Sequence, residues 1–170
     1  VHNYFAYKGI IAPHTGKAYS EAMLMGISGG LLIGYFSFVY TGHDPHVALL
    51  SRNTLDPFNT LLLRLGGAQH IRQSPDATKA EQYLLQALDT GNPAILWADA
   101  FSLPYNNLQF SNDMWASMPI LVYGYEPDKA VAWIADRSAM PLRVSTHELI
   151  AARGRIKKDK NRLLTLDAPN

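Results

Sequence analysis

Residues 119–136 read PILVYGYEPDKAVAWIAD, and this stretch decides the fold class. Two apolar runs, Pro119 to Tyr125 and Ala130 to Asp136, are joined by the turn-forming residues Glu126-Pro127-Asp128-Lys129. Proline and aspartate between two strand-like runs favour an antiparallel β-hairpin. We therefore expect a sheet that is mostly antiparallel.

Outward from this hairpin, capping residues and breakers mark helices, and apolar runs mark further strands. The expected helices are 3–11, 21–27 after Ser20, 57–65 after Asp56, one after Ser74 and one from Ser145 to Gly154. The helix after Ser74 places Ala80, Tyr83, Leu84, Ala87 and Leu88 on one apolar face. The other expected strands are 31–40, 47–50, 94–101 and 162–166. Helices come first and the sheet follows, which predicts an α+β fold.

Composition limits the class of protein. With 170 residues, 48% of them hydrophobic and 17% charged, we expect one ordered domain spanning residues 1–170. A net charge of +1 gives no electrostatic reason for a nucleic-acid partner. The longest apolar stretch, Ile27 to Tyr40, is too short to cross a membrane, and no charged segment precedes it as in a secretory signal. A cytoplasmic location is the default expectation.

A basic cluster lies near the end of the sequence. It consists of Arg153, Arg155, Lys157, Lys158, Lys160 and Arg162. No aromatic residues alternate with these cations as they do in many nucleic-acid sites, so we expect a solvated loop or edge strand.

Short motifs spread over most of the chain carry a resemblance to a known family. They are Ser20-Glu21-Ala22-Met23, Gly26, Gly29-Gly30, Gly34-Tyr35-Phe36, Pro93, Trp97, Asp99, Leu103-Pro104-Tyr105, Gly124-Tyr125, Ala135-Asp136-Arg137 and Asn161-Arg162. In order and spacing they resemble the N-terminal domain of the butirosin biosynthesis protein H family, a papain-like Cys/His group. The resemblance implies a papain-like fold and transfer of an acyl group from a carrier protein to an amine through a cysteine thioester. Relatives commonly carry a C-terminal domain, which we do not find in this sequence.

The same resemblance implies where the catalytic residues would lie. The family's nucleophilic cysteine falls on Asn3, its basic histidine on Met118, and the residue that orients the histidine on Asp136. The chain contains no cysteine. An asparagine amide is no nucleophile at neutral pH, and methionine cannot carry a proton to or from a reacting group. The sequence therefore predicts a catalytically degenerate domain that binds a ligand or partner in the former cleft or serves as an assembly module.

Two alternatives stay open. The chain could be an active acyltransferase or amide hydrolase that uses substituted residues, or a C-terminal domain could supply the function. As partners we expect a small-molecule ligand or an acyl carrier protein, a C-terminal domain or a second copy, and neither nucleic acid nor membrane.

Six residues are candidates for the lining of the cleft: His2, Ser20, Glu21, Asp99, Tyr105 and Trp115. Each also has a structural interpretation. Ser20 is more simply a helix N-cap, and His2 is either a relic of the catalytic pair or a frayed terminal residue. A buried Asp99 or Asp136 must be paired or hydrogen-bonded, and for Asp136 the partner would be Arg137 or backbone amides. The aromatic residues Trp97, Phe101, Tyr105, Phe110 and Trp115 favour the core over a cleft wall.

Neither a metal nor another cofactor is predicted. His43 and His46 have a spacing seen in metal sites, but Pro45 between them forces a turn and no third ligand lies nearby. The glycines from Gly29 to Gly34 lack the Gly-Lys-Ser/Thr ending of a phosphate loop and precede a strand instead of a helix.

Overall fold

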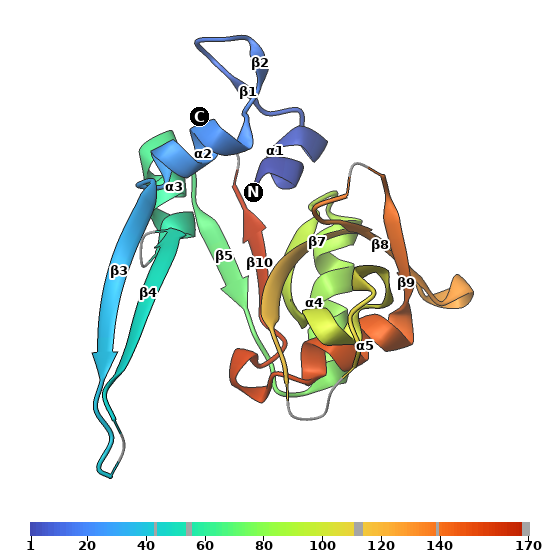
Figure 1. The fold of residues 1–170 in the computed structure, drawn as a ribbon. Coiled ribbons are helices and arrows are strands. Elements are labelled where there is room, and N and C mark those ends of the chain that lie inside the picture. The colour runs from blue at the N-terminus through green and yellow to red at the C-terminus, as the bar shows by residue number, and fades with distance from the viewer. Residues whose placement is uncertain (43, 54–55, 111–113, 139, 168–170) are drawn as a thin grey trace. The chain divides into compact units, whose positions relative to one another are not determined.

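The computed structural model describes residues 1–42, 44–53, 56–110, 114–138 and 140–167. They form two compact units, Val1–Gln69 and His70–Asp167, whose helices and strands are labelled in Figure 1. The fold is α+β with a mostly antiparallel main sheet, as the sequence predicts. That residues 1–170 act as one domain remains a prediction.

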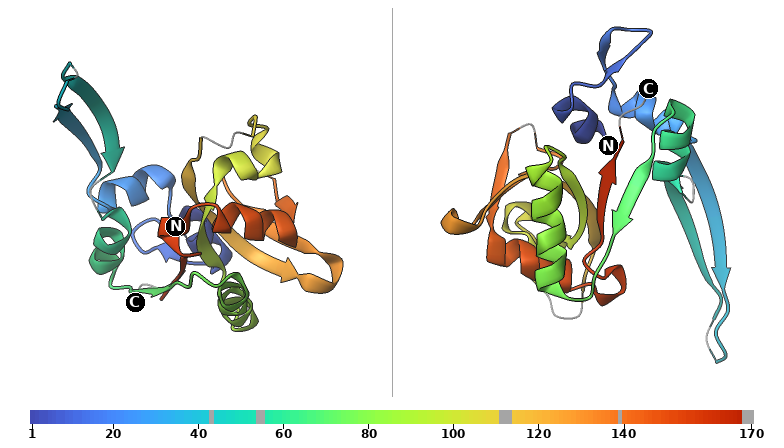
Figure 2. Two further views of the ribbon diagram at one scale, coloured as in Figure 1. Left: turned by 90° about the horizontal axis from the view of Figure 1, so that it is seen from below. Right: turned by 180° about the vertical axis from the view of Figure 1, so that it is seen from behind.

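The first unit consists of short helices and two small two-stranded sheets. In chain order its elements are α1 His2–Tyr7, β1 Ile11–Ala12, β2 Lys17–Ala18, α2 Glu21–Ile27, β3 Leu31–Phe38, β4 His46–Asn53 and α3 Pro57–Leu65. Strands β3 and β4 pair in an unbroken antiparallel register from Leu31 opposite Asn53 to Phe38 opposite His46. This β3–β4 hairpin extends away from α2 and α3 of its own unit (Figures 1 and 2).

The second unit is built on a six-stranded sheet with the order β5-β10-β6-β7-β8-β9. The strands are β5 Gln69–Arg72, β6 Ala94–Asp99, β7 Ser117–Glu126, β8 Val131–Ala135, β9 Leu142–Ser145 and β10 Leu163–Leu166. Two α-helices, α4 Ala77–Asp89 and α5 Thr146–Gly154, belong to this unit, together with the short 3-10 helices η1 Ala100–Ser102, η2 Pro104–Asn106, η3 Pro127–Lys129 and η4 Lys157–Asp159. The turn between β7 and β8 is the Pro127–Lys129 segment, so the predicted hairpin is confirmed.

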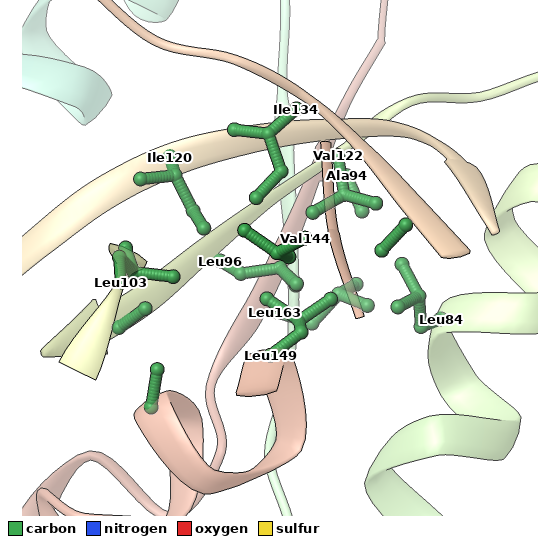
Figure 3. Packing of buried hydrophobic residues seen from close by; sticks show 13 residues of the cluster. Leu84, Ala94, Leu96, Leu103, Ile120, Val122, Ile134, Val144, Leu149 and Leu163 are labelled. Carbon is green, nitrogen blue, oxygen red and sulfur yellow. The ribbon is translucent and has the colours of Figure 1, made fainter. Parts of the chain in front are cut away.

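The core of the second unit lies between one face of this sheet and the two α-helices (Figure 3). Alternate residues of a strand point to the same face, so Leu96, Ile120 and Ile134 project together from three neighbouring strands. Helix α4 adds Leu84 and α5 adds Leu149, and both side chains are fully buried. The predicted stripe of α4 is confirmed, since its remaining members Ala80, Tyr83, Ala87 and Leu88 are buried or partly buried.

Three helices begin and end where their capping residues predict. Helix α2 follows the N-cap Ser20, whose hydroxyl accepts a hydrogen bond from the Met23 amide. Helix α3 follows Asp56 and ends at Gly66, which adopts the left-handed conformation with φ 73°. Helix α5 has a complete capping box between Ser145 and Glu148.

Removing this capping box should destabilise the protein measurably. Ser145→Ala deletes the oxygen that accepts from the Glu148 amide at 3.1 Å, and we expect a loss of about 1 kcal/mol in the free energy of unfolding. Glu148→Gln is the matched control, because glutamine can still reach back to the Ser145 amide. Urea unfolding followed by circular dichroism measures both variants. Equal midpoints for Ser145→Ala and wild type would contradict the role of the cap.

Three local predictions are wrong. The first helix ends at Tyr7 and not at Ile11, because Gly9 adopts the left-handed conformation with φ 66° and Ile11 begins strand β1. The N-cap of α4 is Asp76 and not Ser74, because the Asp76 carboxylate accepts from the amides of Thr78 and Lys79 at 2.8 and 3.2 Å. Ser74 instead accepts from the Asp76 amide and supports the turn before the helix. The short strands β1, β2 and β9 were not predicted, because two to four residues carry no readable alternation.

The basic cluster is only partly solvated, which corrects the prediction from sequence. Arg153 is buried in α5 and donates to the Asn161 carbonyl at 2.8 Å. Burial lowers the pKa of Arg153 to about 10, so it remains cationic near neutral pH. The guanidinium of Arg162 lies 3.8 Å from the centre of the Trp97 ring. These arginines hold elements of the second unit together.

The apolar stretch from Ile27 to Tyr40 supplies strand β3. Among the described residues, none of the helices has the length and apolar character needed to span a bilayer.

Candidate functional site

One end of the main sheet gathers several residues singled out from the sequence. Here β6 ends, β7 begins and β8 ends, with Asp99 opposite Ser117, Ala98 opposite Met118, and Leu121 opposite Ala135. Asp136 directly follows Ala135, so the antiparallel register brings it to the end of the sheet that holds Met118. The structure thus places two of the three expected catalytic positions close together within the second unit.

Met118 and Asp136 are linked through Arg137. The Arg137 Nη2 lies 3.8 Å from the Met118 sulfur, and its Nε lies 3.9 Å from an Asp136 carboxylate oxygen. The Asp136 side chain is only 8% exposed, whereas that of Arg137 is 73% exposed. Asp136 therefore has the partner expected for a buried carboxylate, and Arg137 presents a cation to solvent beside it.

Tyr105 from η2 is the second partner of Asp136. Its hydroxyl donates to the carboxylate at 3.2 Å. Burial, the negative charge of Asp136 and this hydrogen bond together raise the pKa of Tyr105 far above its ordinary value of 10.0, while the charge of Arg137 acts in the opposite direction. Tyr105 therefore stays a neutral hydrogen-bond donor at physiological pH.

The raised pKa of Tyr105 predicts how stability depends on pH. The folded protein holds this proton more tightly than the unfolded chain, so the stabilisation is complete below pH 10 and is lost as the pH rises toward the folded value. The difference in unfolding free energy between wild type and Tyr105→Phe should therefore be constant below about pH 10 and shrink above it. Denaturant unfolding over a pH series measures this difference. Tyr7→Phe is a control at an exposed tyrosine. A difference that stays constant at high pH would contradict the pairing with Asp136.

Asp99 is buried and fully engaged within the protein. Its carboxylate accepts from the Ser102 hydroxyl at 2.7 Å and from the Ala116 amide at 2.8 Å, and it pairs with the Arg155 Nε at 3.2 Å. Because a buried carboxylate is stable only when paired and hydrogen-bonded, these contacts satisfy it. The hydrogen bond from the Ala116 amide also holds the segment before β7 against the end of β6.

Trp115 and Phe110 are exposed, contrary to the expectation that the aromatic set lies in the core. The Lys158 ammonium lies 4.6 Å from the centre of the Trp115 ring, and the Arg155 guanidinium lies 4.4 Å from that of Phe110. Aromatic faces attract cations, so these basic residues cover rings that would otherwise face water alone. Sequence reasoning missed these contacts because the partners lie about 40 residues apart in the chain.

The remaining candidates belong to the first unit. His2 is the first residue of α1, and its Nδ1 donates to the Tyr19 carbonyl at 2.7 Å, so its ring is held in place. Asn3 is the second residue of this helix, as expected for the nucleophile position. Glu21 begins α2 and is exposed. The expected convergence of Asn3 with Met118 and Asp136 remains a prediction.

The histidine pair considered for metal binding includes His43, which lies outside the described residues. Within the ranges that the structure describes, no group of three or more His, Cys, Asp or Glu side chains could hold a metal ion.

A family model described as butirosin biosynthesis protein H, N-terminal, matches residues 5–137. The chain belongs to this family. The match covers more than three quarters of the chain and confirms the resemblance found in the sequence motifs. No curated protein matches the chain.

The match to the butirosin biosynthesis protein H family covers two of the three expected catalytic positions. The matched range contains Met118 and Asp136 and begins after His2 and Asn3. The assignment of the nucleophile position to Asn3 therefore still rests on spacing alone. The sequence offers Arg137, the last matched residue, as one possible partner of Asp136, but gives no signal of its contact with the Met118 sulfur.

Proposed function

We propose that this chain is a papain-like domain of the butirosin biosynthesis protein H family that has lost thiol catalysis and binds a ligand at the end of the sheet where Met118 and Asp136 lie. The observation that carries the proposal is the surroundings of Met118. At the position expected for the family's basic histidine stands a thioether, and the Arg137 guanidinium lies in contact with it.

This arrangement cannot perform the proton transfers of a Cys/His mechanism. Such a mechanism needs a group with a pKa near the operating pH that takes a proton from the nucleophile and returns it to the leaving group. An arginine stays protonated, and a thioether has no proton to exchange. Asp136 would orient a histidine in the family, but here it accepts from Tyr105 and lies beside Arg137. The orienting residue is retained without a base to orient.

The same side chains are suited to binding. The exposed guanidinium of Arg137 offers several donors to a carbonyl or anionic group of a ligand, and Asp136 lies beside it. The neutral hydroxyl of Tyr105 and the sulfur of Met118 are the polar and apolar groups next to this cation. The ligand would be recognised by one acceptor group and an apolar portion.

The proposal predicts that the chain does not become acylated. After incubation with a short-chain acyl thioester, the intact mass should stay unchanged, because the sequence holds no thiol to exchange with the donor. Intact-protein mass spectrometry measures this result. A relative of the family that retains the cysteine is the positive control for the donor. A stoichiometric adduct on one serine or lysine would instead support an active acyltransferase with substituted residues and would identify its nucleophile.

A further inference from the structure

The β3–β4 hairpin exposes far more apolar surface than a hairpin in water normally does. Most large apolar residues of both strands are exposed, and an isolated two-stranded sheet is marginally stable in water. The exposed set is Leu31, Leu32, Ile33, Tyr35, Phe36, Phe38, Val47 and Leu49. Such a surface is expected to be covered in the functional protein.

The two faces of the hairpin differ. Directly paired residues share a face, so Ile33, Tyr35 and its partner Leu49 lie on one face together with Leu31 and Val47. These five side chains are 56–83% exposed. On the opposite face the Phe36 ring covers Gly34, where an added Cβ would lie 2.6 Å from the ring, and it stacks with Phe38 at a centroid distance of 6.4 Å. The opposite face is thus partly covered by its own rings, and the face of Leu31, Ile33, Tyr35, Val47 and Leu49, here called the open face, is not.

The edges of the hairpin have little of the usual protection against pairing. Natural edge strands are blunted by charged side chains, above all lysine, by proline or by bulges. Strands β3 and β4 contain neither lysine nor proline, and their register has no irregularity over all eight pairs. Strand β4 contains one charged residue, Arg52, which pairs with Leu32 and therefore belongs to the opposite face; the positions of the open face, 31, 33, 35 and 37 with 47, 49, 51 and 53, include no Asp, Glu, Lys or Arg. A partner cannot be selected here by charge and must instead present an uncharged apolar surface of matching shape.

We infer that the open face is a dimerisation surface that packs against the open face of a second copy of this chain. A two-fold interface requires a patch that complements itself, and an uncharged apolar sheet face meets this requirement without repulsion. At about 150–200 Å² for a fully exposed large apolar residue, the five side chains offer about 500–700 Å² per chain. Two copies would bury about 1,000–1,400 Å², which reaches the minimum of about 1,000 Å² for a specific interface.

Association of the 170-residue chain tests this inference directly. Sedimentation velocity should give twice the chain mass of 18.9 kDa at micromolar concentration. Ile33→Lys and Leu49→Lys place charges in the open face and should weaken dimerisation at least tenfold. Leu63→Lys is the matched control, because Leu63 is 70% exposed on α3 of the same unit and lies outside the hairpin. A monomeric wild type, dimers unaffected by both hairpin variants, or aggregates that grow without limit would each overturn the inference.

A cross-linking experiment keeps the test decisive if the lysine variants fold poorly. Because the chain has no cysteine, Ile33→Cys introduces a single thiol near the middle of the open face. Mild oxidation should convert most of this variant into a disulfide-linked dimer, whereas Leu63→Cys should stay largely monomeric. Equal cross-linking of the two variants would show random collision and would contradict pairing through the open face. This outcome is independent of the ligand site, so either proposal can fail without the other.

Discussion

Asp99→Ala is expected to lower the free energy of unfolding by about 3–5 kcal/mol, the range found when one partner of a buried ion pair is removed. The variant leaves the Arg155 guanidinium, 17% exposed, without its carboxylate and strips the Ala116 amide and Ser102 hydroxyl of their acceptor. These groups are partly buried, so water replaces the lost carboxylate only in part. Denaturant unfolding monitored by tryptophan fluorescence measures the loss.

Two controls separate charge from hydrogen bonding in this prediction. Asp99→Asn keeps an oxygen for the Ala116 amide but removes the charge, so its effect should fall between those of wild type and Asp99→Ala. Asp167→Ala breaks the pair between Asp167 and His70. Both side chains are more than half exposed, so the variant should lower the free energy of unfolding by no more than about 1 kcal/mol. If Asp99→Ala were as mild as Asp167→Ala, Asp99 would not be an anchor of the fold, and its candidacy for ligand contact would gain support.

The parts of the fold that could be predicted from sequence are those governed by local chemistry. Helices α2 and α3 match the predicted ranges because their start and stop signals are local. Ser20 and Asp56 cap the first turn that follows them, and the glycines after Leu65 end α3. The β7–β8 hairpin follows for the same reason. The sequence predicts Ser74 as the cap of α4, whereas the structure has Asp76 two positions later; both residue types are good N-caps, and only the backbone geometry decides between them.

Properties that depend on distant contacts were not predictable. The basic cluster suggests solvent, yet Arg153 is buried because the Asn161 carbonyl accepts its hydrogen bond. The apolar run that forms β3 suggests burial, yet the open face of the hairpin is exposed. Charge and hydropathy indicate whether a residue prefers solvent or the core. Whether it lies there depends on contacts with residues elsewhere in the chain.

The candidate site was predicted in part. Family motifs singled out Met118 and Asp136, and the sheet register brings them to one end of the second unit. The partners of Asp136 could not be chosen from sequence alone: Arg137 is one of the alternatives that the sequence offers, whereas Tyr105 is expected in the cleft lining or the core and not as a partner of Asp136. The contact between Arg137 and the Met118 sulfur depends on side-chain geometry that motif spacing does not encode.

The second large effect concerns Asn3 and Met118, the positions expected for the family's nucleophile and base. Asn3→Cys alone should introduce a thiol with a pKa near the ordinary value of about 8.5, because Met118 offers no imidazolium to stabilise the thiolate. Adding Met118→His should lower that pKa and raise the alkylation rate at pH 6 to 7 by about tenfold or more, since the thiolate is the reacting species. Asp136 lies at the same end of the sheet as position 118, and we expect it to orient the new ring.

Matched variants make this effect specific. Asn3→Cys combined with Met140→His places an imidazole at an exposed methionine of the second unit and should leave the thiol at its ordinary reactivity. Adding Asp136→Asn to the Asn3→Cys/Met118→His pair should remove part of the gain, because the ring loses the carboxylate that orients it. Circular dichroism of every variant confirms that the fold is retained.

The most direct test of descent from a Cys/His enzyme is the coupling between Asn3→Cys and Met118→His, measured as the alkylation rate of the introduced thiol with iodoacetamide at pH 6 to 7. We expect the double variant to react about tenfold or more faster than Asn3→Cys alone, and the Met140→His combination to match the single variant. Equal rates in all three folded proteins would contradict the assignment of Asn3 and Met118 to the family's nucleophile and base.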